Sequence, residues 1–185
     1  MSLRKLSSID IERASNWLDV VDRENLVKDA IALVHDLEKE LGELFLLTNL
    51  QSVTSSYAEI FVRDPSGPLE MVETVSGLYL KSYRGVSILV PLTIHAFVIT
   101  ETSCCLDEGR VISFSPVMLT NVFEECSTKA ITQLKEKYSN ALIRHGYSEI
   151  PLSELSIPFD GSILGEHPFD HDQLRIFDVL FQNIH

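Results

Sequence analysis

The best candidate for a metal site is the segment Glu166-His167-Pro168-Phe169-Asp170-His171-Asp172. Imidazole and carboxylate groups are ligands that zinc, iron and manganese take in proteins. On a helix, His167 and His171 would share one face because they are four residues apart. The residues after His167 instead have the pattern of a helix start, in which Asp170 and Asp172 serve as cap and dipole partners. We therefore expect no cofactor, and His167, His171 and Asp170 are the candidates for a divalent metal.

A second candidate site centres on His95, which lies in the apolar run from Val86 to Thr100. We interpret His95 as a core histidine held by a hydrogen bond, and the alternative is a titratable group inside a pocket. If the sheet curves, Tyr79 and Glu101 could line such a cavity with it. The sequence has no nucleophile motif of the G-x-S-x-G type and no phosphate-binding glycine loop. The expectation therefore leans away from an enzyme.

The three cysteines, Cys104, Cys105 and Cys126, have no regular spacing. An odd number without a pattern argues against a disulfide scaffold and for a reducing compartment. Cys104 and Cys105 precede a predicted turn at Asp107-Glu108-Gly109, so one of them could be reactive. The competing interpretation is that both fill buried space.

The run from Val86 to Thr100 predicts the centre of a sheet. It is rich in β-branched residues, and its fifteen residues are fewer than the roughly 20 that a membrane helix needs. We predict two strands, Val86–Val90 and Leu92–Thr100, separated by Pro91, which cannot donate to a ladder. Both faces of the second strand are mostly apolar, so both sides of the sheet must be covered.

The remaining chain is divided by caps, turns and apolar periodicity. We predict a short helix capped by Ser7, Ser8 or Asp10, and a turn at Asp64-Pro65-Ser66-Gly67-Pro68 that reverses the chain. The predicted elements are helices over 8–19 and 22–47, strands over 51–63, 69–75, 77–82 and 110–114, a helix from 116 to about 144, an irregular segment over 147–167 and a helix over 168–182. A turn near Tyr83-Arg84-Gly85 is predicted to lead into the central run.

Short connections between the strands favour antiparallel neighbours. The predicted fold class is α+β: an antiparallel meander sheet of five or six strands, flanked by N-terminal helices, a long helix after the sheet and a C-terminal helix. We expect one domain over 1–185, with a helical part over 1–48, the sheet over 51–115, the long helix over 116–145, and a wrapped segment with the final helix over 146–185. Whether the long helix breaks near Ser127-Thr128 stays open.

The formal net charge is −12, and the excess of acids is steepest over residues 145–185, where Arg175 is the one base. An acidic surface repels phosphate backbones and anionic lipid, so nucleic acid and membranes are poor partners. A basic protein partner suits it, and Asp170, Asp172 and Asp178 are the candidate surface. High charge also serves solubility alone.

Two functions are compatible with these features. The first is a cytoplasmic, non-catalytic protein-interaction module of a chaperone, inhibitor or immunity type, either as a monomer or as a homodimer. The alternative is a small-molecule binder or enzyme with a cavity between the sheet and the long helix. Fold-level analogy does not decide between them.

Overall fold

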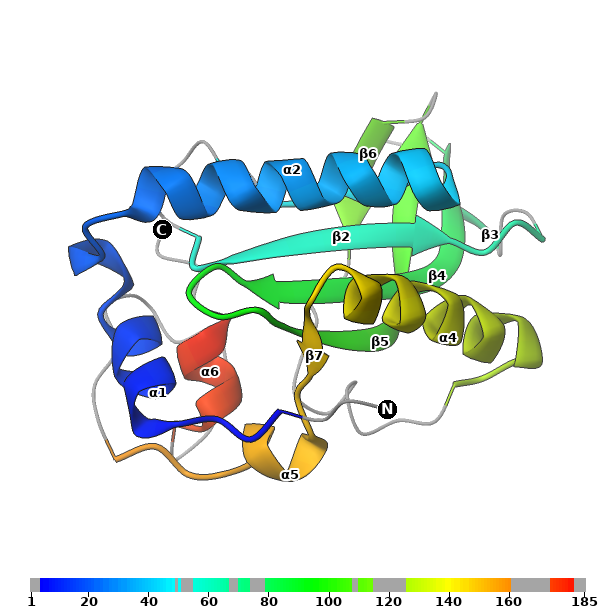
Figure 1. Ribbon diagram of the computed structural model, residues 1–185. Helices are drawn as coiled ribbons and strands as arrows, with labels where there is room; N and C mark the ends of the chain where they lie inside the picture. The colour runs from blue at the N-terminus through cyan, green and yellow to red at the C-terminus, as the bar shows by residue number, and fades with distance from the viewer. Residues whose placement is uncertain are drawn as a thin grey trace.

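A sheet of seven described strands runs through the molecule, with helices on both of its faces (Figure 1). The computed structural model describes residues 4–48, 50, 55–66, 70–73, 79–107, 110–114, 126–160 and 174–181. In chain order the elements are α1 (Ser8–Ser15), a short 3-10 helix (Trp17–Asp19), α2 (Arg23–Leu41), β1 (Phe45–Leu46), β2 (Tyr57–Arg63), β3 (Glu70–Glu73), β4 (Tyr79–Pro91), β5 (Ala96–Asp107), β6 (Arg110–Phe114), α4 (Lys129–Arg144), β7 (Ser148–Glu149), α5 (Leu152–Leu155) and α6 (Ile176–Leu180).

The centre of the sheet is the antiparallel pair β4 and β5, in register from Lys81 with Leu106 to Leu89 with Val98. Both strands are longer than the sequence predicts. The predicted turn near residues 83–85 is wrong, because these residues continue the ladder opposite Cys104, Ser103 and Thr102 within β4. β4 ends at Pro91, and a turn over residues 92–95 leads into β5. The predicted strand over Leu92–Thr100 is therefore wrong in its first four residues.

The sheet is mostly antiparallel, but it is not a meander. β2 pairs with β4 from Tyr57 opposite Pro91 to Arg63 opposite Gly85, and β3 pairs with the same edge of β4 further along. The turn at residues 64–68 was predicted to reverse the chain; instead β2 and β3 run in the same direction along β4. On the other side, β7 joins β5 in parallel, with Ala96 opposite Ser148.

One face of the sheet packs against α2 and α4 (Figure 1). The shared core contains Leu33 and Leu37 of α2 with Tyr138 and Leu142 of α4. Trp17, in the 3-10 helix that follows α1, is 1% exposed in this core. The helices α1, α5 and α6 cover part of the opposite face and contribute the following residues to a second core: Ala14, Leu155, Ile176, Phe177, Val179 and Leu180.

Local signals fix the helix ends. Ser7 caps α1, since its hydroxyl accepts from the Asp10 amide at 3.2 Å while the Asp10 carboxylate accepts from the Ser7 amide at 3.0 Å. α2 stops at Leu41, before the predicted Leu47, because Gly42 has a φ of 103°.

The long helix predicted from residue 116 does not run through residue 128. Thr128 has an extended backbone, and its hydroxyl caps α4 by accepting from the Ile131 amide at 3.2 Å. α4 therefore begins at Lys129. It ends at Arg144, as predicted, and Gly146 follows with a φ of 84°. Residues 115–125 lie outside the described part of the chain, as do residues 161–173 at the start of the predicted final helix.

Gly85 allows the close approach of β2 to β4. A Cβ placed there would lie 2.8 Å from the ring of Phe61 and closer still to the Val62 carbonyl. We expect Gly85→Ala to lower the free energy of unfolding by about 1–3 kcal/mol through overpacking, measured by urea denaturation. The control Thr102→Ala removes atoms from the residue paired with Gly85 and should cost less. Equal losses would contradict this account.

Candidate functional site

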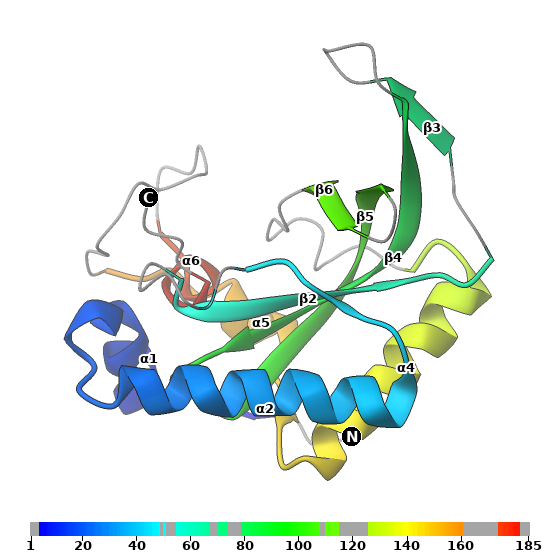
Figure 2. The same ribbon diagram turned by 90° about the horizontal axis from the view of Figure 1, so that it is seen from above.

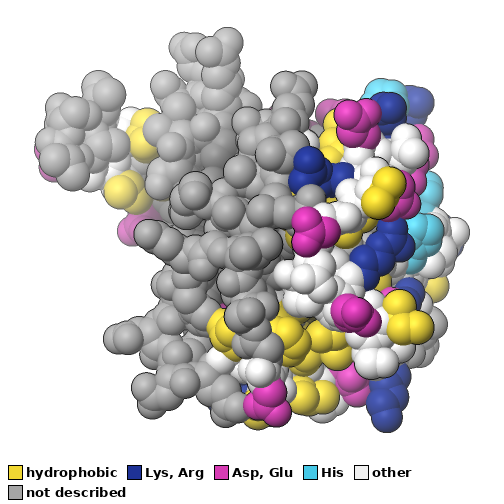
Figure 3. Space-filling view, turned by 90° about the vertical axis from the view of Figure 1, so that its left-hand side faces the viewer, with side chains coloured by type: hydrophobic (Ala, Val, Ile, Leu, Met, Phe, Trp, Pro, Cys, Tyr) yellow, Lys and Arg dark blue, Asp and Glu magenta, His cyan; other side chains and the backbone are white. Residues whose placement is uncertain are grey.

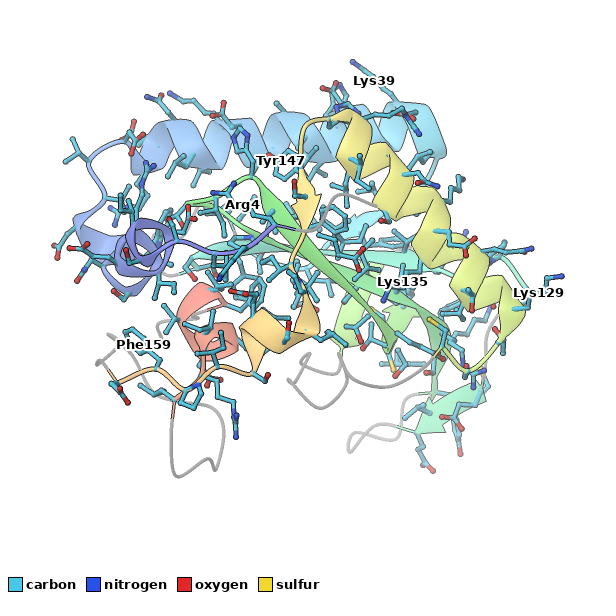
Figure 4. All side chains as sticks on the ribbon, turned by 60° about the horizontal axis from the view of Figure 1, so that its bottom comes forward. Arg4, Lys39, Lys129, Lys135, Tyr147 and Phe159 are labelled. Carbon is cyan, nitrogen blue, oxygen red and sulfur yellow. The ribbon has the colours of Figure 1, made fainter. Side chains whose placement is uncertain are left out.

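The three residues predicted to line a cavity lie apart. His95 is exposed in the turn between β4 and β5, while Tyr79, 63% exposed, lies at the opposite end of β4. The interpretation of His95 as a core residue is wrong, because β4 ends at Pro91 and leaves the imidazole in the turn. Its ring stacks on Tyr147 with centroids 5.0 Å apart, beside α2 (Figure 4).

Glu101 has a structural role in the middle of β5. Its carboxylate accepts hydrogen bonds from the amide and the hydroxyl of Ser127, both at 2.6 Å, and pairs with the Arg84 guanidinium at 3.3 Å. Because Ser127 immediately precedes the Thr128 cap, these contacts fix the start of α4 on the sheet. No cavity brings Glu101 together with His95 or Tyr79 in the described part of the chain.

Of the predicted partner surface, only Asp178 is described, and it is 5% exposed. Its Oδ2 accepts from the Arg175 amide at 2.8 Å at the start of α6. Asp178 is therefore a capping residue and not part of a surface. Asp170 and Asp172 lie outside the described residues, as do the metal candidates His167 and His171. Among the residues that are described, no three His, Cys, Asp or Glu side chains gather as metal ligands.

Cys104 and Cys105 lie inside β5 and not in the turn that follows it. Burial, with smaller effects of Cys105 and Glu59, raises the pKa of the Cys104 thiol to about 12. The thiolate is the reactive form, so this shift makes Cys104 a poor nucleophile near neutral pH. This supports the interpretation of Cys104 as buried filler.

Glu59 is a buried acid in the middle of β2, with 2% of its surface exposed. The Ser87 hydroxyl of β4 donates to its Oε1 at 2.8 Å. Burial raises the pKa of Glu59 from 4.5 to about 7, and the hydrogen bond from Ser87 opposes part of that rise. The sheet thus contains a carboxyl group that changes charge near neutral pH. Glu59 was not among the predicted site residues. Its position within the otherwise apolar strand Tyr57–Arg63 was the signal that could have identified it.

A surface pocket of about 440 Å³ is lined by residues from the C-terminal end of α2, the end of β2, β4 and α4. Its charged members are Glu43, Arg63, Asp64 and Lys137. The remaining lining residues are mostly apolar or aromatic: Leu41, Val62, Pro65, Tyr83, Leu134 and Tyr138. This pocket occupies the expected place between the sheet and the helix that follows it, but none of the three predicted cavity residues lines it.

One ion pair and one hydrogen bond from a lysine organise the pocket. Arg63 pairs with Glu43 at 2.6 Å, and its guanidinium lies 5.6 Å from the centre of the Tyr83 ring. Lys137 donates from Nζ to the Leu41 carbonyl at 3.1 Å, at the C-terminal end of α2, where a cation is favoured.

The other prominent surface is an arm formed by residues 70–73 of β3 and 79–82 of β4, which projects from the body of the molecule (Figure 2). Every residue of β3 is exposed. Across the ladder Met71 lies opposite Lys81 and Glu73 opposite Tyr79, so these four share one face. Hydrophobic side chains are visible on this projection, at the left of Figure 3.

Comparison with protein-family models, curated proteins and solved structures finds no match to this chain. None of the described helices has both the length and the apolar character that crossing a membrane requires. The function must therefore be argued from the surfaces themselves.

The raised pKa of Glu59 predicts a pH-dependent stability. The carboxyl group of Glu59 loses its proton near pH 4.5 in the unfolded chain and near pH 7 in the folded chain. Between these values the folded state binds more protons than the unfolded state, so the free energy of unfolding falls as the pH rises. Glu59→Gln keeps an acceptor for Ser87 and removes this dependence. We expect equal stability near pH 4 and a variant more stable by up to about 3 kcal/mol at pH 8, in urea denaturation at each pH.

The exposed Glu136 on α4 provides a matched control. Glu136→Gln should leave the pH profile of the wild type unchanged. A Glu59→Gln profile parallel to that of the wild type would contradict the assignment.

Proposed function

We propose that this protein is a non-catalytic interaction module that binds a basic protein partner through the β3–β4 arm. The observation that carries the proposal is the pair Met71 and Tyr79, 55% and 63% exposed on one face of a projecting ladder. Met and Tyr are enriched at protein interfaces relative to the rest of protein surfaces. An arm that projects from the body can enter a groove of a partner with little rearrangement.

The free edge of β3 adds a second recognition element. Within the described part of the chain, β3 pairs only with β4, so the main-chain groups on its other edge are available to an extended segment. Such strand addition gives affinity through main-chain hydrogen bonds and specificity through alternate side chains. Met71 and Tyr79 would then contact the apolar side chains of that segment.

Charge determines the kind of partner. The chain has a formal net charge of −12, and β3 itself begins and ends with exposed glutamates, Glu70 and Glu73. A field of this sign accelerates association with basic proteins and disfavours acidic ones. The proposed partner is therefore a basic protein that presents an extended segment of apolar and positively charged residues.

The test compares two double variants in capture experiments from an extract of the source cells, with the retained proteins identified by mass spectrometry. Met71→Ser with Tyr79→Ser removes the apolar face of the arm. Leu152→Ser with Ile157→Ser removes two side chains that are 38% and 44% exposed elsewhere. We expect basic proteins to be retained by the wild type and by the second variant and lost with the first, with capture weakening as salt rises.

A purified captured protein should then bind in titration calorimetry with the same ranking of variants. Identical capture by all three proteins would exclude the arm as the binding surface. Sedimentation of the wild type as a dimer and of the arm variant as a monomer would instead make the occupant a second copy of this chain.

A further inference from the structure

The pocket between α2, α4 and β2 contains two charges of opposite sign that have no ionic partner among the described residues. Arg63 and Glu43 neutralise each other through their ion pair. Lys137 donates to a neutral carbonyl, and Asp64 accepts from the Ser66 amide at 3.0 Å. Neither Lys137 nor Asp64 forms an ion pair with any residue that the structure describes. The pocket therefore presents one cation and one anion to whatever enters it.

Asp64 is held firmly in this position. Its amide donates to the Arg84 carbonyl at 2.8 Å, which extends the contact between β2 and β4 by one residue. Only 8% of Asp64 is exposed, although it carries a carboxylate. A carboxylate that is nearly buried without a cation is costly, and a ligand ammonium that enters the pocket would relieve that cost.

Lys137 is suited to the opposite end of such a ligand. An ammonium group has three donors, and the hydrogen bond to the Leu41 carbonyl uses one of them. Its Nζ lies 5.7 Å from the centre of the Tyr138 ring, which places the charge beside an aromatic wall. The remaining donors can bind a carboxylate.

The pocket also offers an apolar surface beside these charges. Leu41, Tyr83 and Leu134 line it with side chains that are only partly buried. The volume of about 440 Å³ lies within the range of small-molecule sites. An apolar ligand body would cover these side chains while its two ends reach the charges.

We propose that this pocket binds a small zwitterion with an apolar body, of the free amino acid class. The ligand ammonium pairs with Asp64, the ligand carboxylate with Lys137, and the hydrocarbon part contacts Leu41, Tyr83 and Leu134. This inference does not rest on the role of the β3–β4 arm. It assigns a second, independent binding activity to the protein.

Titration followed by two-dimensional NMR of the full chain tests the proposal. Two probes cover two spacings of the charges: L-leucine, with both on one carbon, and 6-aminohexanoate, with five methylene groups between them. We expect saturable shifts for at least one probe at the amides of residues 62–64 and 134–138. N-acetyl-L-leucine lacks the ammonium, and L-leucinamide lacks the carboxylate. If L-leucine binds, each of these analogues should bind roughly tenfold more weakly than L-leucine, because each has lost one of the two charges.

Variants assign the two ends. Lys137→Gln should weaken zwitterion binding about tenfold, and Asp64→Asn, which keeps the acceptor for the Ser66 amide, should do the same. The control Lys129→Gln alters a lysine at the outer end of the same helix (Figure 4) and should leave binding unchanged. If neither probe shifts these amides, or if the neutralised analogues bind L-leucine's site as well as L-leucine does, the proposal is wrong.

Discussion

The pairing of β4 with β5 is the constraint on which the rest of the structure depends. From Lys81 to Leu89 each residue of β4 lies opposite one of β5, and every other strand of the sheet except β1 attaches directly to one of these two. Their apolar residues point to both faces, so the ladder is stable only if both faces are covered. This requirement places α2 and α4 on one side and α1, α5 and α6 on the other.

Coverage on both faces also explains how an acid comes to lie inside the sheet. Glu59 occupies the face of β2 opposite to the one that packs on α2, and in a sheet with one wet face its carboxylate would reach water. Here it is enclosed, and its carboxyl group accepts a hydrogen bond from the Ser87 hydroxyl. Enclosure favours the neutral form, and a neutral carboxyl group can remain in the interior at modest cost.

Much of the architecture was predictable from local signals. The strand character of the central run, the cap at Ser7, the end of α4 near Gly146 and the α+β class follow from propensity and turn chemistry. The end of α2 was predicted six residues too late, although Gly42 marks it in the sequence. The sheet order was not predictable, because Asp64-Pro65 has the same sequence signature whether the chain reverses or bulges outward. Which of the two occurs depends on pairing with β4, a contact between distant parts of the chain.

The positions of the candidate site residues also depend on contacts between distant parts of the chain. His95 was judged from the apolar residues around it, whereas its position depends on where β4 ends. The pocket combines residues from four elements that are far apart in the sequence, so no spacing pattern marks it. Glu59 differs, because an acid inside an apolar strand is visible in the sequence.

The alignment of β2 and β3 along one edge of β4 has a consequence for the length of the chain between them. The register of each strand is set by its own pairs with β4, and not by the connection from Arg63 to Glu70. A hairpin turn of altered length would shift one strand against the other, but here an inserted peptide would change neither ladder. Past Ser66, whose amide donates to the pocket residue Asp64, this connection is therefore a suitable position for introducing a peptide tag.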